Sequence, residues 1–410
     1  MKVCVIGNGG REHALAWRLS ISPSVTKVYA IPGSAAMSDC AELVGIDWQQ
    51  SDHLIRFLKD NHVDLVVVGP EAPLVAGLAD VLNAAGIPVF GPSKAAAQLE
   101  GSKVFAKDLM KKYNIPTAAY GVFHKVDEAK EFIAQTGAPI VVKADGLAAG
   151  KGVVVAMTVE EANAAVEDML SGNRFGDAGS TVVIEEFMEG EEASLLAFVD
   201  GKTVVPMIAS QDHKRIFDGD KGPNTGGMGT YAPAPVLTDA LRDEAMKTIL
   251  EPMVAAMQKE GMPYVGCLYA GLMITPQGPK VVEFNARFGD PETQVVLPLL
   301  DSDLGQIMMA CATGTLTADM VKWKDSSAAC VILASKGYPE TSSKGDVIHG
   351  DIKQHDTTIV FHSGTKLVGE EYVTNGGRVL GVVGLGKDLR TALDRAYGRI
   401  EHIDFEGMQY

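Results

Sequence analysis

The first hundred residues alternate short runs of β-branched residues with segments of helical periodicity. Alternation of this kind predicts βαβ units and a parallel sheet. The strand ends at Gly7, Gly69-Pro70-Glu71 and Gly91-Pro92 should then lie along one carboxyl edge, where such sheets bind ligands. The expected strands are Lys2 to Ile6, Lys27 to Ala30, Asp64 to Val68 and Pro88 to Phe90, and the expected helices are near His13 to Ser20, Asp52 to Asn61 and Leu74 to Ala85.

Two further regions follow. From Gly101 to about Asp303 the pattern is one of helices and hairpins, and after Trp323 a strand-rich region begins. In that last region we expect strands at Ala328 to Leu333, Thr357 to Ser363 and Arg378 to Val383, and a closing helix at Leu389 to Ile400. A chain of 410 residues is long enough for two to four domains of usual size.

Composition limits the partners. The formal charge of -16 and the pI near 5.0 disfavour nucleic acid and anionic membranes, so any phosphate site must be a local basic pocket. The five cysteines form no C-x-x-C pair, which favours buried free thiols and the cytosol. Met1 leads directly into a strand rather than a signal peptide, and no apolar run reaches membrane length.

A strand near residue 283 carries polar side chains on one face. Residues two apart on a strand share a face, so Glu283, Asn285 and Arg287 should point together while Val282 and Phe284 pack on the other side. Carboxylate and amide oxygens suit Mg²⁺, and an arginine fork suits a phosphate or carboxylate. An edge strand with a solvated polar face is the alternative, but the Val-rich flanks and the Gly-Asp-Pro-Glu continuation favour a cation site.

The segment Gly7-Asn8-Gly9-Gly10-Arg11-Glu12-His13 follows the first strand and opens a helix, so its backbone N–H groups can receive an anion. It is not a dinucleotide fingerprint, because Glu12 replaces the third glycine and no acidic residue ends the second strand. A phosphate or phosphosugar site, a dehydrogenase cofactor site and a turn without ligand all remain open.

Two glycine-rich segments are candidate covers for a nucleotide. Residues 140 to 155 form a hairpin with Lys143 on its first strand, and its glycine spacing does not match a Walker A loop. A strand lysine beside a glycine-rich lid is another way to hold a triphosphate, although such segments are often surface turns. Residues 211 to 229 combine Asp-His-Lys-Arg with a glycine nest, which predicts one long loop over an active site or a solvated charged loop.

Other segments are less specific. The apolar strand from Val182 ends in acidic and aromatic residues that, alone, are typical of a solvated loop. No G-x-S-x-G nucleophile elbow occurs, and the nine histidines show no metal-site spacing.

Taken together, Lys103, Lys143 with its glycine loop, Glu185 to Glu192 and the Glu283/Asn285 strand resemble an ATP-grasp nucleotide site. Six blocks, in order, resemble the phosphoribosylamine-glycine ligase family over nearly the whole chain. The blocks are Gly7 to Ala14, Gly69 to Leu74, Lys143 to Gly152, Ser210 to Arg215, Gly222 to Gly229 and Arg287-Phe288-Gly289-Asp290-Pro291-Glu292.

The resemblance implies an α/β fold in three parts. These are an N-terminal Rossmann-like parallel-sheet domain at residues 1–101, an ATP-grasp domain at 102–325 with a small lid subdomain at about 117–189, and a C-terminal β-rich α+β domain at 326–410. It implies a cytoplasmic, monomeric carbon–nitrogen ligase of purine biosynthesis that joins glycine to 5-phosphoribosylamine. The enzyme would use ATP with Mg²⁺ or Mn²⁺, form glycyl phosphate, and have no nucleic-acid or membrane partner.

The resemblance also implies site residues. For ATP these are Lys103, Lys143, Gly150, Lys151, Glu185, Glu186, Phe187, Met188 and Glu192. The metal ligands would be Glu283 and Asn285, and the catalytic residues Arg287 and Asp290. For the substrates the residues are Gly9, Gly10, Arg11, Glu71, Asp212, Lys214, Asn224, Thr225, Asp290, Lys366 and Arg378.

The sequence departs from the family pattern in two places. Many ATP-grasp enzymes carry a second acidic metal ligand on the preceding strand, but Tyr269-Ala270-Gly271-Leu272 has none, so one or two metal ions stay open. The family usually continues past Tyr410 with a short basic tail, so a truncated or unusual end is expected. An ATP-grasp carboxylase, a ligase for another amino acid, and a nucleotide-binding module without catalysis are the alternatives.

Overall fold

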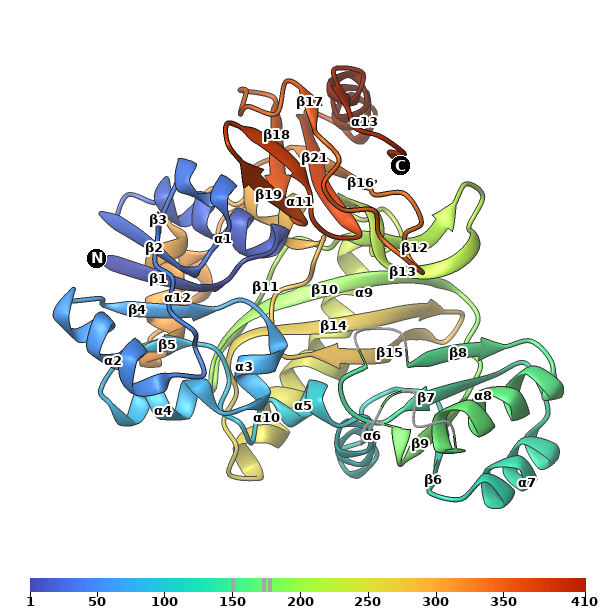
Figure 1. Ribbon diagram of the computed structural model, residues 1–410. Coiled ribbons are helices and arrows are strands. Elements are labelled where there is room, and N and C mark those ends of the chain that lie inside the picture. The colour runs from blue at the N-terminus through green and yellow to red at the C-terminus, as the bar shows by residue number, and fades with distance from the viewer. Residues whose placement is uncertain (149–151, 172–174, 176–178) are drawn as a thin grey trace.

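The computed structural model describes residues 1–148, 152–171, 175 and 179–410, and these residues form an N-terminal sheet, a central sheet, a small sheet and a C-terminal sheet (Figure 1). Gly150 and Lys151, which were expected in the nucleotide site, lie outside the described residues. The N-terminal sheet and the small sheet lie at opposite ends of the molecule, and the C-terminal sheet lies above the central one in this view (Figure 1).

The N-terminal sheet is parallel throughout, with strand order β3-β2-β1-β4-β5, which confirms the predicted βαβ pattern. The predicted helix over 74–85 is wrong in one respect: it breaks at Gly77, whose φ of +94° lies in the left-handed region that glycine tolerates. The elements are β1 Lys2–Gly7, α1 Gly10–Ser20, β2 Lys27–Pro32, η1 Ala35–Asp39, β3 Glu42–Leu43, α2 Ser51–Asp60, β4 Leu65–Val68, α3 Glu71–Val75, α4 Leu78–Ala84 and β5 Val89–Phe90.

The central sheet is antiparallel in the order β11-β10-β14-β15, and a separate antiparallel sheet, β6-β9-β7-β8, carries α7 and α8. We call the second unit, residues 120–186, the small subdomain. Its elements are β6 Tyr120–Phe123, α7 Val126–Thr136, β7 Ile140–Ala144, β8 Val153–Ala156, α8 Val159–Ser171 and β9 Val182–Glu186. The other elements of this region are α5 Gln98–Gly101, α6 Lys103–Lys112, β10 Glu191–Asp200, β11 Val204–Pro206, α9 Asp239–Ala245, η3 Met246–Leu250, α10 Glu251–Lys259, β14 Val265–Thr275, β15 Gly278–Asn285, α11 Thr293–Val296, η4 Leu297–Leu299, α12 Leu304–Thr313 and η5 Ala318–Met320.

The prediction of one long loop over residues 211–229 is wrong, because this segment is a hairpin of β12 Gln211–Phe217 and β13 Lys221–Ala232. Its inner strand β13 pairs with β16, so the hairpin completes the C-terminal sheet, in the order β12-β13-β16-β21-β18. Glycine-rich sequence has low strand propensity, and only pairing with a distant strand makes it extended. The remaining elements are β16 Ser327–Ala334, β17 His349–Gly350, β18 Thr358–His362, β19 Thr365–Val368, β20 Glu371–Thr374, β21 Arg378–Gly386, α13 Leu389–Ile400 and β22 Ile403–Asp404.

The hydrophobic cores show which parts are joined. One core contains Val5 of the N-terminal sheet, Phe198 of the central sheet and Phe361 of the C-terminal sheet. The small subdomain has a core of its own, with buried residues between Ala129 and Ile184. Three of the sheets therefore share one core, whereas the small subdomain packs around a separate core. None of the helices in the described part of the chain has the length and hydropathy needed to span a membrane.

Candidate active site

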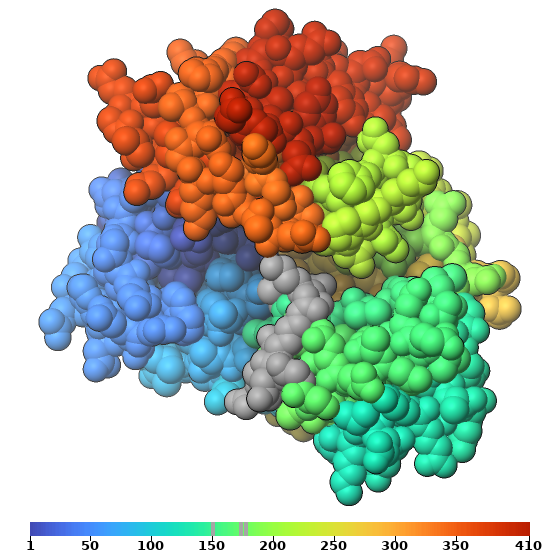
Figure 2. All heavy atoms as spheres, turned by 45° about the vertical axis from the view of Figure 1, so that its right-hand side comes forward, coloured from blue at the N-terminus to red at the C-terminus, as the bar shows by residue number. Residues whose placement is uncertain are grey.

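A small cavity of about 20 Å³ lies where β10, β12, β14 and β15 meet. The hairpin and the small subdomain lie one above the other on the same side of the molecule (Figure 2). The cavity is lined by Glu192, Ala193, Ser194, Asp212, Lys214, Tyr269, Gly271, Leu272, Val282 and Glu283. Glu192, Asp212, Lys214 and Glu283, all expected at the site, are thus brought together from segments far apart in sequence.

The strand that carries Glu283 and Asn285 has the predicted alternation at this end, since Glu283 lies opposite Gly271 and Asn285 opposite Tyr269, while Phe284 is buried in the core. Val282 differs from the prediction. A bulge in the register leaves it without a partner on β14, and it lines the cavity beside Glu283 instead of packing on the opposite face. Bulges re-aim side chains in this way and are frequent beside active sites.

Cations surround Glu283. The Nζ atom of Lys214 lies 3.8 Å from its carboxylate. Burial alone would raise the pKa of Glu283, but the charges of Lys214, Lys143 and Arg287 outweigh burial and lower it. The carboxylate is therefore held ionised, the state that a metal ligand needs.

Lys103 and Lys143 lie near this carboxylate, as expected. The Nζ atom of Lys103 donates to the carbonyl oxygens of Ala144 and Gly146, at 2.8 and 3.0 Å. The Nζ atom of Lys143 donates to the carbonyl of Val282 at 3.1 Å. Burial, followed by the charge of Lys143, lowers the pKa of Lys103 despite the attraction of Glu283 and Asp145. The two ammonium groups thus form one basic region beside Glu283.

Glu185 has two lysine partners, one of which the sequence did not reveal. Its carboxylate lies 3.0 Å from Nζ of Lys107 and 2.7 Å from Nζ of Lys143, and all three side chains are buried. Lys107 also donates to the hydroxyl of Thr117 and the carbonyl of Ala118. Lys107 lies on the buried face of α6, one turn after Lys103. This helical spacing is the signal by which the sequence could have indicated Lys107 as a site residue.

The other expected nucleotide residues follow Glu185 along the chain. Glu186 is exposed, and Phe187 and Met188 are half-buried in the link between β9 and β10. Glu192 is the second residue of β10 and lines the cavity. The link thus joins the buried Glu185 pair to the edge of the cavity.

Arg287 is held between two glutamates. Its guanidinium lies 3.4 Å from the carboxylate of Glu71 and 3.1 Å from that of Glu100, which also accepts a hydrogen bond from the Ala286 N–H. Arg11 is similarly engaged, with its Nε atom 2.5 Å from Glu12 and its NH1 group donating to the carbonyl of Phe288. Both arginine forks therefore join the N-terminal sheet to the central region, and Glu100 is a partner that the sequence did not indicate.

The glycines at the start of α1 surround Glu12. The Gly9 N–H donates to the Glu12 carboxylate at 3.1 Å, and a Cβ atom on Gly7 or Gly69 would overlap the Glu12 side chain. A Cβ atom on Gly10 would likewise overlap the hydroxyl of Ser363. Glu12, which breaks the dinucleotide fingerprint, thus fills the space above the strand ends, and the C-terminal region closes over α1.

Asp290 lies at the N-terminus of α1, near Gly9. Its carboxylate accepts hydrogen bonds from the side chain of Gln294, at 2.8 Å, and from the backbone N–H of Arg11. Burial opposes ionisation of this carboxyl group, but the charges of Arg378 and Arg11 and these hydrogen bonds lower its pKa. Part of the anion-binding capacity of this helix terminus is therefore taken by the protein's own carboxylate.

Arg378 holds two backbone segments together. Its NH1 group donates to the carbonyl oxygens of Gly226 in the hairpin and of Asp290, both at 2.9 Å. Thr225 donates to the carbonyl of Lys214 and accepts from the Gly227 N–H, so it shapes the hairpin. Asn224 is exposed, and Lys366 is exposed on β19, which packs against η1. The structure thus places Lys366 and Arg378 in different surroundings.

Asp212 and Glu292 both have carboxylate oxygens that are closed to solvent. Burial first, and then the charge of Glu292, raises the pKa of Asp212, and burial likewise raises that of Glu292. Tyr269 donates to Glu292 at 3.3 Å and is within 2.9 Å of the Ser194 hydroxyl. Glu292 was not among the expected site residues, although it closes the Arg-Phe-Gly-Asp-Pro-Glu block.

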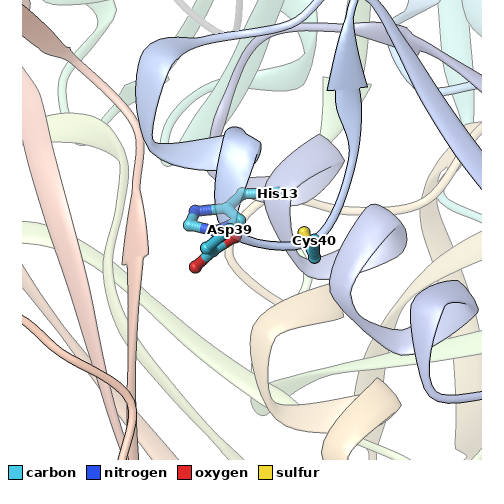
Figure 3. A group of neighbouring side chains, drawn as sticks. All are labelled: His13, Asp39 and Cys40. Atoms are coloured by element: carbon cyan, nitrogen blue, oxygen red, sulfur yellow. Dashed lines mark hydrogen bonds and ion pairs between the residues drawn. The ribbon is translucent and has the colours of Figure 1, made fainter.

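A second group with metal-ligand atoms lies outside the cavity: His13, Asp39 and Cys40 are within 4.8 Å of one another (Figure 3). The backbone N–H of His362 donates to Nδ1 of His13 at 3.0 Å, so a neutral His13 ring carries its proton on Nε2, facing Asp39 at 3.3 Å. Neither ring nitrogen then offers a free lone pair. His13 is better described as a contact between α1 and β18.

Three family models match the chain. They are the N domain of phosphoribosylglycinamide synthetase at residues 1–100, its ATP-grasp (A) domain at 101–293 and its C domain at 328–410.

Curated relatives and solved structures agree with these matches. The phosphoribosylamine–glycine ligase of Neisseria meningitidis serogroup A is 53% identical, with 100% of this chain and 97% of the relative covered. That of Halalkalibacterium halodurans is also 53% identical, with 100% and 95% covered. The crystal structure of the Thermotoga maritima phosphoribosylamine–glycine ligase has a TM-score of 0.87 at 33% identity, covering 100% of this chain and 99% of that one.

A biotin carboxylase domain from Hydrogenobacter thermophilus, in complex with MgADP, has a TM-score of 0.77 at 17% identity, covering 100% of this chain and 91% of that one, and shows likeness of fold alone. The N-terminal parallel sheet, the central region and the C-terminal antiparallel sheet thus match the fold class that the sequence predicted. The chain belongs to the phosphoribosylglycinamide synthetase family, whose central domain is an ATP-grasp domain.

Proposed function

We propose that this chain is a carbon–nitrogen ligase that joins glycine to 5-phosphoribosylamine with ATP, giving glycinamide ribonucleotide, ADP and phosphate in purine biosynthesis. The glycine carboxylate attacks the γ-phosphate of ATP to give glycyl phosphate. The amine of phosphoribosylamine then attacks the acyl carbon, and phosphate leaves. The curated relatives named above support this reaction.

One observation carries the proposal: the charges of three lysines, Lys103, Lys143 and Lys214, act on the carboxylate of Glu283, which lines the cavity beside Lys214. Phosphoryl transfer needs little covalent chemistry from the protein and depends on positioning and neutralisation of charge. In the proposed site, Lys103 and Lys143 bind phosphate oxygens.

The residues present fit a divalent cation. Glu283 is held ionised, and Glu283 and Asn285 offer hard oxygen donors from one face of a strand. We propose that these two residues hold Mg²⁺ or Mn²⁺, which would neutralise phosphate charge when bound.

The remaining expectations for the sites are part of the proposal. For the nucleotide, Glu186, Phe187 and Met188 contact the base, and Glu192 the ribose. For phosphoribosylamine, Gly9 and Gly10 offer backbone N–H groups. We further propose domain boundaries at residues 1–101, 102–325 and 326–410, a monomer, and a cytoplasmic location.

The test is ADP release by the purified chain with Mg-ATP, glycine and freshly prepared phosphoribosylamine. ADP and phosphate should form in equal amounts only when both acceptors are present. Equal release without glycine, or without the amine, would contradict the proposal. Release with bicarbonate or another amino acid in place of glycine would favour a different ligase of the same superfamily.

A further inference from the structure

Lys107 is a buried lysine whose ammonium group has no donor to spare. Its Nζ atom lies 2.8 Å from the hydroxyl oxygen of Thr117, 2.8 Å from the carbonyl oxygen of Ala118 and 3.0 Å from the carboxylate of Glu185. An ammonium group has three N–H donors, and these three acceptors use all of them. Since the residue is only 3% exposed, Lys107 is bound fully within the protein and is not available to a ligand.

Lys143 contacts the other oxygen of the same carboxylate, but it is held less completely. Its Nζ atom lies 2.7 Å from Oε2 of Glu185, yet Oε2 has no hydrogen-bond partner among the described residues, so this contact is an ion pair without the angles of a hydrogen bond. Within the described part of the chain, the hydrogen bond that Lys143 donates goes to the carbonyl of Val282 on β15. Lys143 therefore has donor capacity left for a further acceptor, which Lys107 lacks.

The charges of this buried group do not cancel. Lys107 and Lys143 bring two positive charges to the single negative charge of Glu185, and all three side chains are buried. One cation is sufficient to offset the carboxylate, and Lys107 offsets it with a directed hydrogen bond. The charge of Lys143 is then available elsewhere, and it already acts on Glu283 of β15. Because an uncompensated buried charge is unfavourable, this surplus favours an anionic ligand.

We propose that Lys107 is a positioning residue for nucleotide binding, because it offsets the charge of Glu185 and so allows Lys143 to turn from this carboxylate to the phosphates of ATP. Without Lys107, the same movement of Lys143 would leave Glu185 as a buried carboxylate with no cation, which is strongly unfavourable. Lys143 would then stay paired with Glu185 and contribute little to ATP binding. The inference rests on the proposed function, since it specifies how one of the proposed ATP-binding lysines is made available.

Lys107 also holds the joint between the small subdomain and the central region. Thr117 and Ala118 lie just before the first strand of the small subdomain, and Glu185 lies near the end of its last strand. Thr117 in turn donates to the carbonyl of Val281 on β15. Lys107 on α6 thus contacts both connections to a subdomain whose core is separate. The competing explanation is that Lys107 is only a structural link at this joint and has no effect on ATP binding.

The first experiment measures Mg-ATP binding by calorimetry, without the other substrates. Lys107→Met should raise the Kd of Mg-ATP at least about tenfold, because Glu185 then retains Lys143. Lys112→Met, the same change at an exposed position of the same helix, should leave the Kd within about twofold. A folded Lys107→Met protein with an unchanged Kd would overturn the proposal and support the structural link.

The second experiment tests whether Lys107 acts through Glu185. Glu185→Gln removes the negative charge, so Lys143 no longer has to offset it. Adding Lys107→Met to Glu185→Gln should therefore change the Kd of Mg-ATP by no more than about twofold, although the same change raises it at least about tenfold in the unaltered protein. A tenfold rise in the Glu185→Gln protein as well would overturn the proposal, because Lys107 would then act independently of this carboxylate.

A second variant covers the case in which Lys107→Met does not fold. Lys107→Gln removes the same charge, but its amide can still donate to Glu185, and it should also raise the Kd of Mg-ATP at least about tenfold. Failure of the unaltered protein to bind Mg-ATP would overturn the proposed function and this inference with it. Normal ATP binding and ADP release by the unaltered protein, combined with an unchanged Kd in folded Lys107→Met or Lys107→Gln, would overturn only the role of Lys107.

Discussion

Carboxylates at the two ends of the candidate site have opposite surroundings. At one end Glu283 faces Lys214, and Glu185 is held between Lys107 and Lys143. At the other end lie Asp212 and Glu292, whose pKa values burial raises rather than lowers. The same type of side chain is thus held ionised at one end, whereas ionisation is opposed at the other. The neighbours of a carboxylate, rather than its presence, decide what it binds.

The chain builds the two ends from different parts. The lysine end comes from α6, β7 and β9, next to a small subdomain with its own core. The acidic end comes from the hairpin and the turn before α11, which Arg378 joins through backbone carbonyls. Four substitutions test whether this division holds.

The largest effect is expected for Lys107→Met, which leaves the buried Glu185 with only Lys143. Removing one partner of a buried pair should lower the free energy of unfolding by about 3 kcal/mol, measured by chemical denaturation. Lys112→Met is the matched control on the same helix, since its pair with Glu260 is exposed and should contribute little. Equal losses of unfolding free energy in both variants would mean that the buried Lys107–Glu185 pair stabilises the protein no more than the exposed Lys112–Glu260 pair does.

Glu283→Gln tests the metal-binding role of the lysine end. We expect kcat to fall by roughly 100-fold, because one electrostatic contribution to the transition state is lost, while the melting temperature changes little. Glu244→Gln is the control. Glu244 is an exposed residue of α9 whose carboxylate lies near Gly278, the first residue of the same strand. Near-normal turnover of Glu283→Gln at saturating Mg²⁺ would make Glu283 structural.

Arg378→Ala tests what holds the acidic end in place. Losing two charged hydrogen bonds to carbonyls should lower the free energy of unfolding by roughly 2 kcal/mol and raise the KM of both glycine and phosphoribosylamine. A rise of about tenfold confined to phosphoribosylamine would instead identify Arg378 as a phosphate ligand. Lys366→Ala, on an exposed side chain, separates a phosphate contact from a change in stability.

The smallest effect is expected for the stability of Asp212→Asn without ligand. A carboxyl group whose folded pKa is raised makes the folded state less stable as pH rises from about 4 through that raised value. The Asn variant should therefore be more stable than the unaltered protein at pH 8, on the order of 1 kcal/mol, with the difference disappearing near pH 4. Thermal melts of both proteins from pH 4 to pH 8 provide the measurement. An Asp212→Asn variant that is less stable than the unaltered protein at pH 8 would contradict the prediction.

Local patterns were sufficient where each element is specified by its own residues. Buried Val runs followed by glycine predicted the parallel strands, and the period of two placed Glu283 and Asn285 on one face. They failed where pairing across the molecule overrides local preference. The glycine-rich β13 is extended because it pairs with β16, and Val282 turns inward because of a bulge.

Partners distant in sequence were invisible for a related reason. No local sequence pattern marked Lys107 as a buried, paired lysine. Its partner is Glu185, which lies 78 residues later in the chain. Arg287 was predicted to bind a ligand, but the structure shows it between Glu71 and Glu100. A motif specifies a side chain's chemistry and cannot show which groups will neutralise it.

The sequence by itself determined the fold class, the family and the residue types that carry the chemistry, because strand periodicity, glycine turns and motif order are local properties of the chain. Tertiary structure alone decided which carboxylates are paired and which remain without partners. The reason is that electrostatic interactions depend on distance and burial, and both are set by packing between segments that are far apart along the chain.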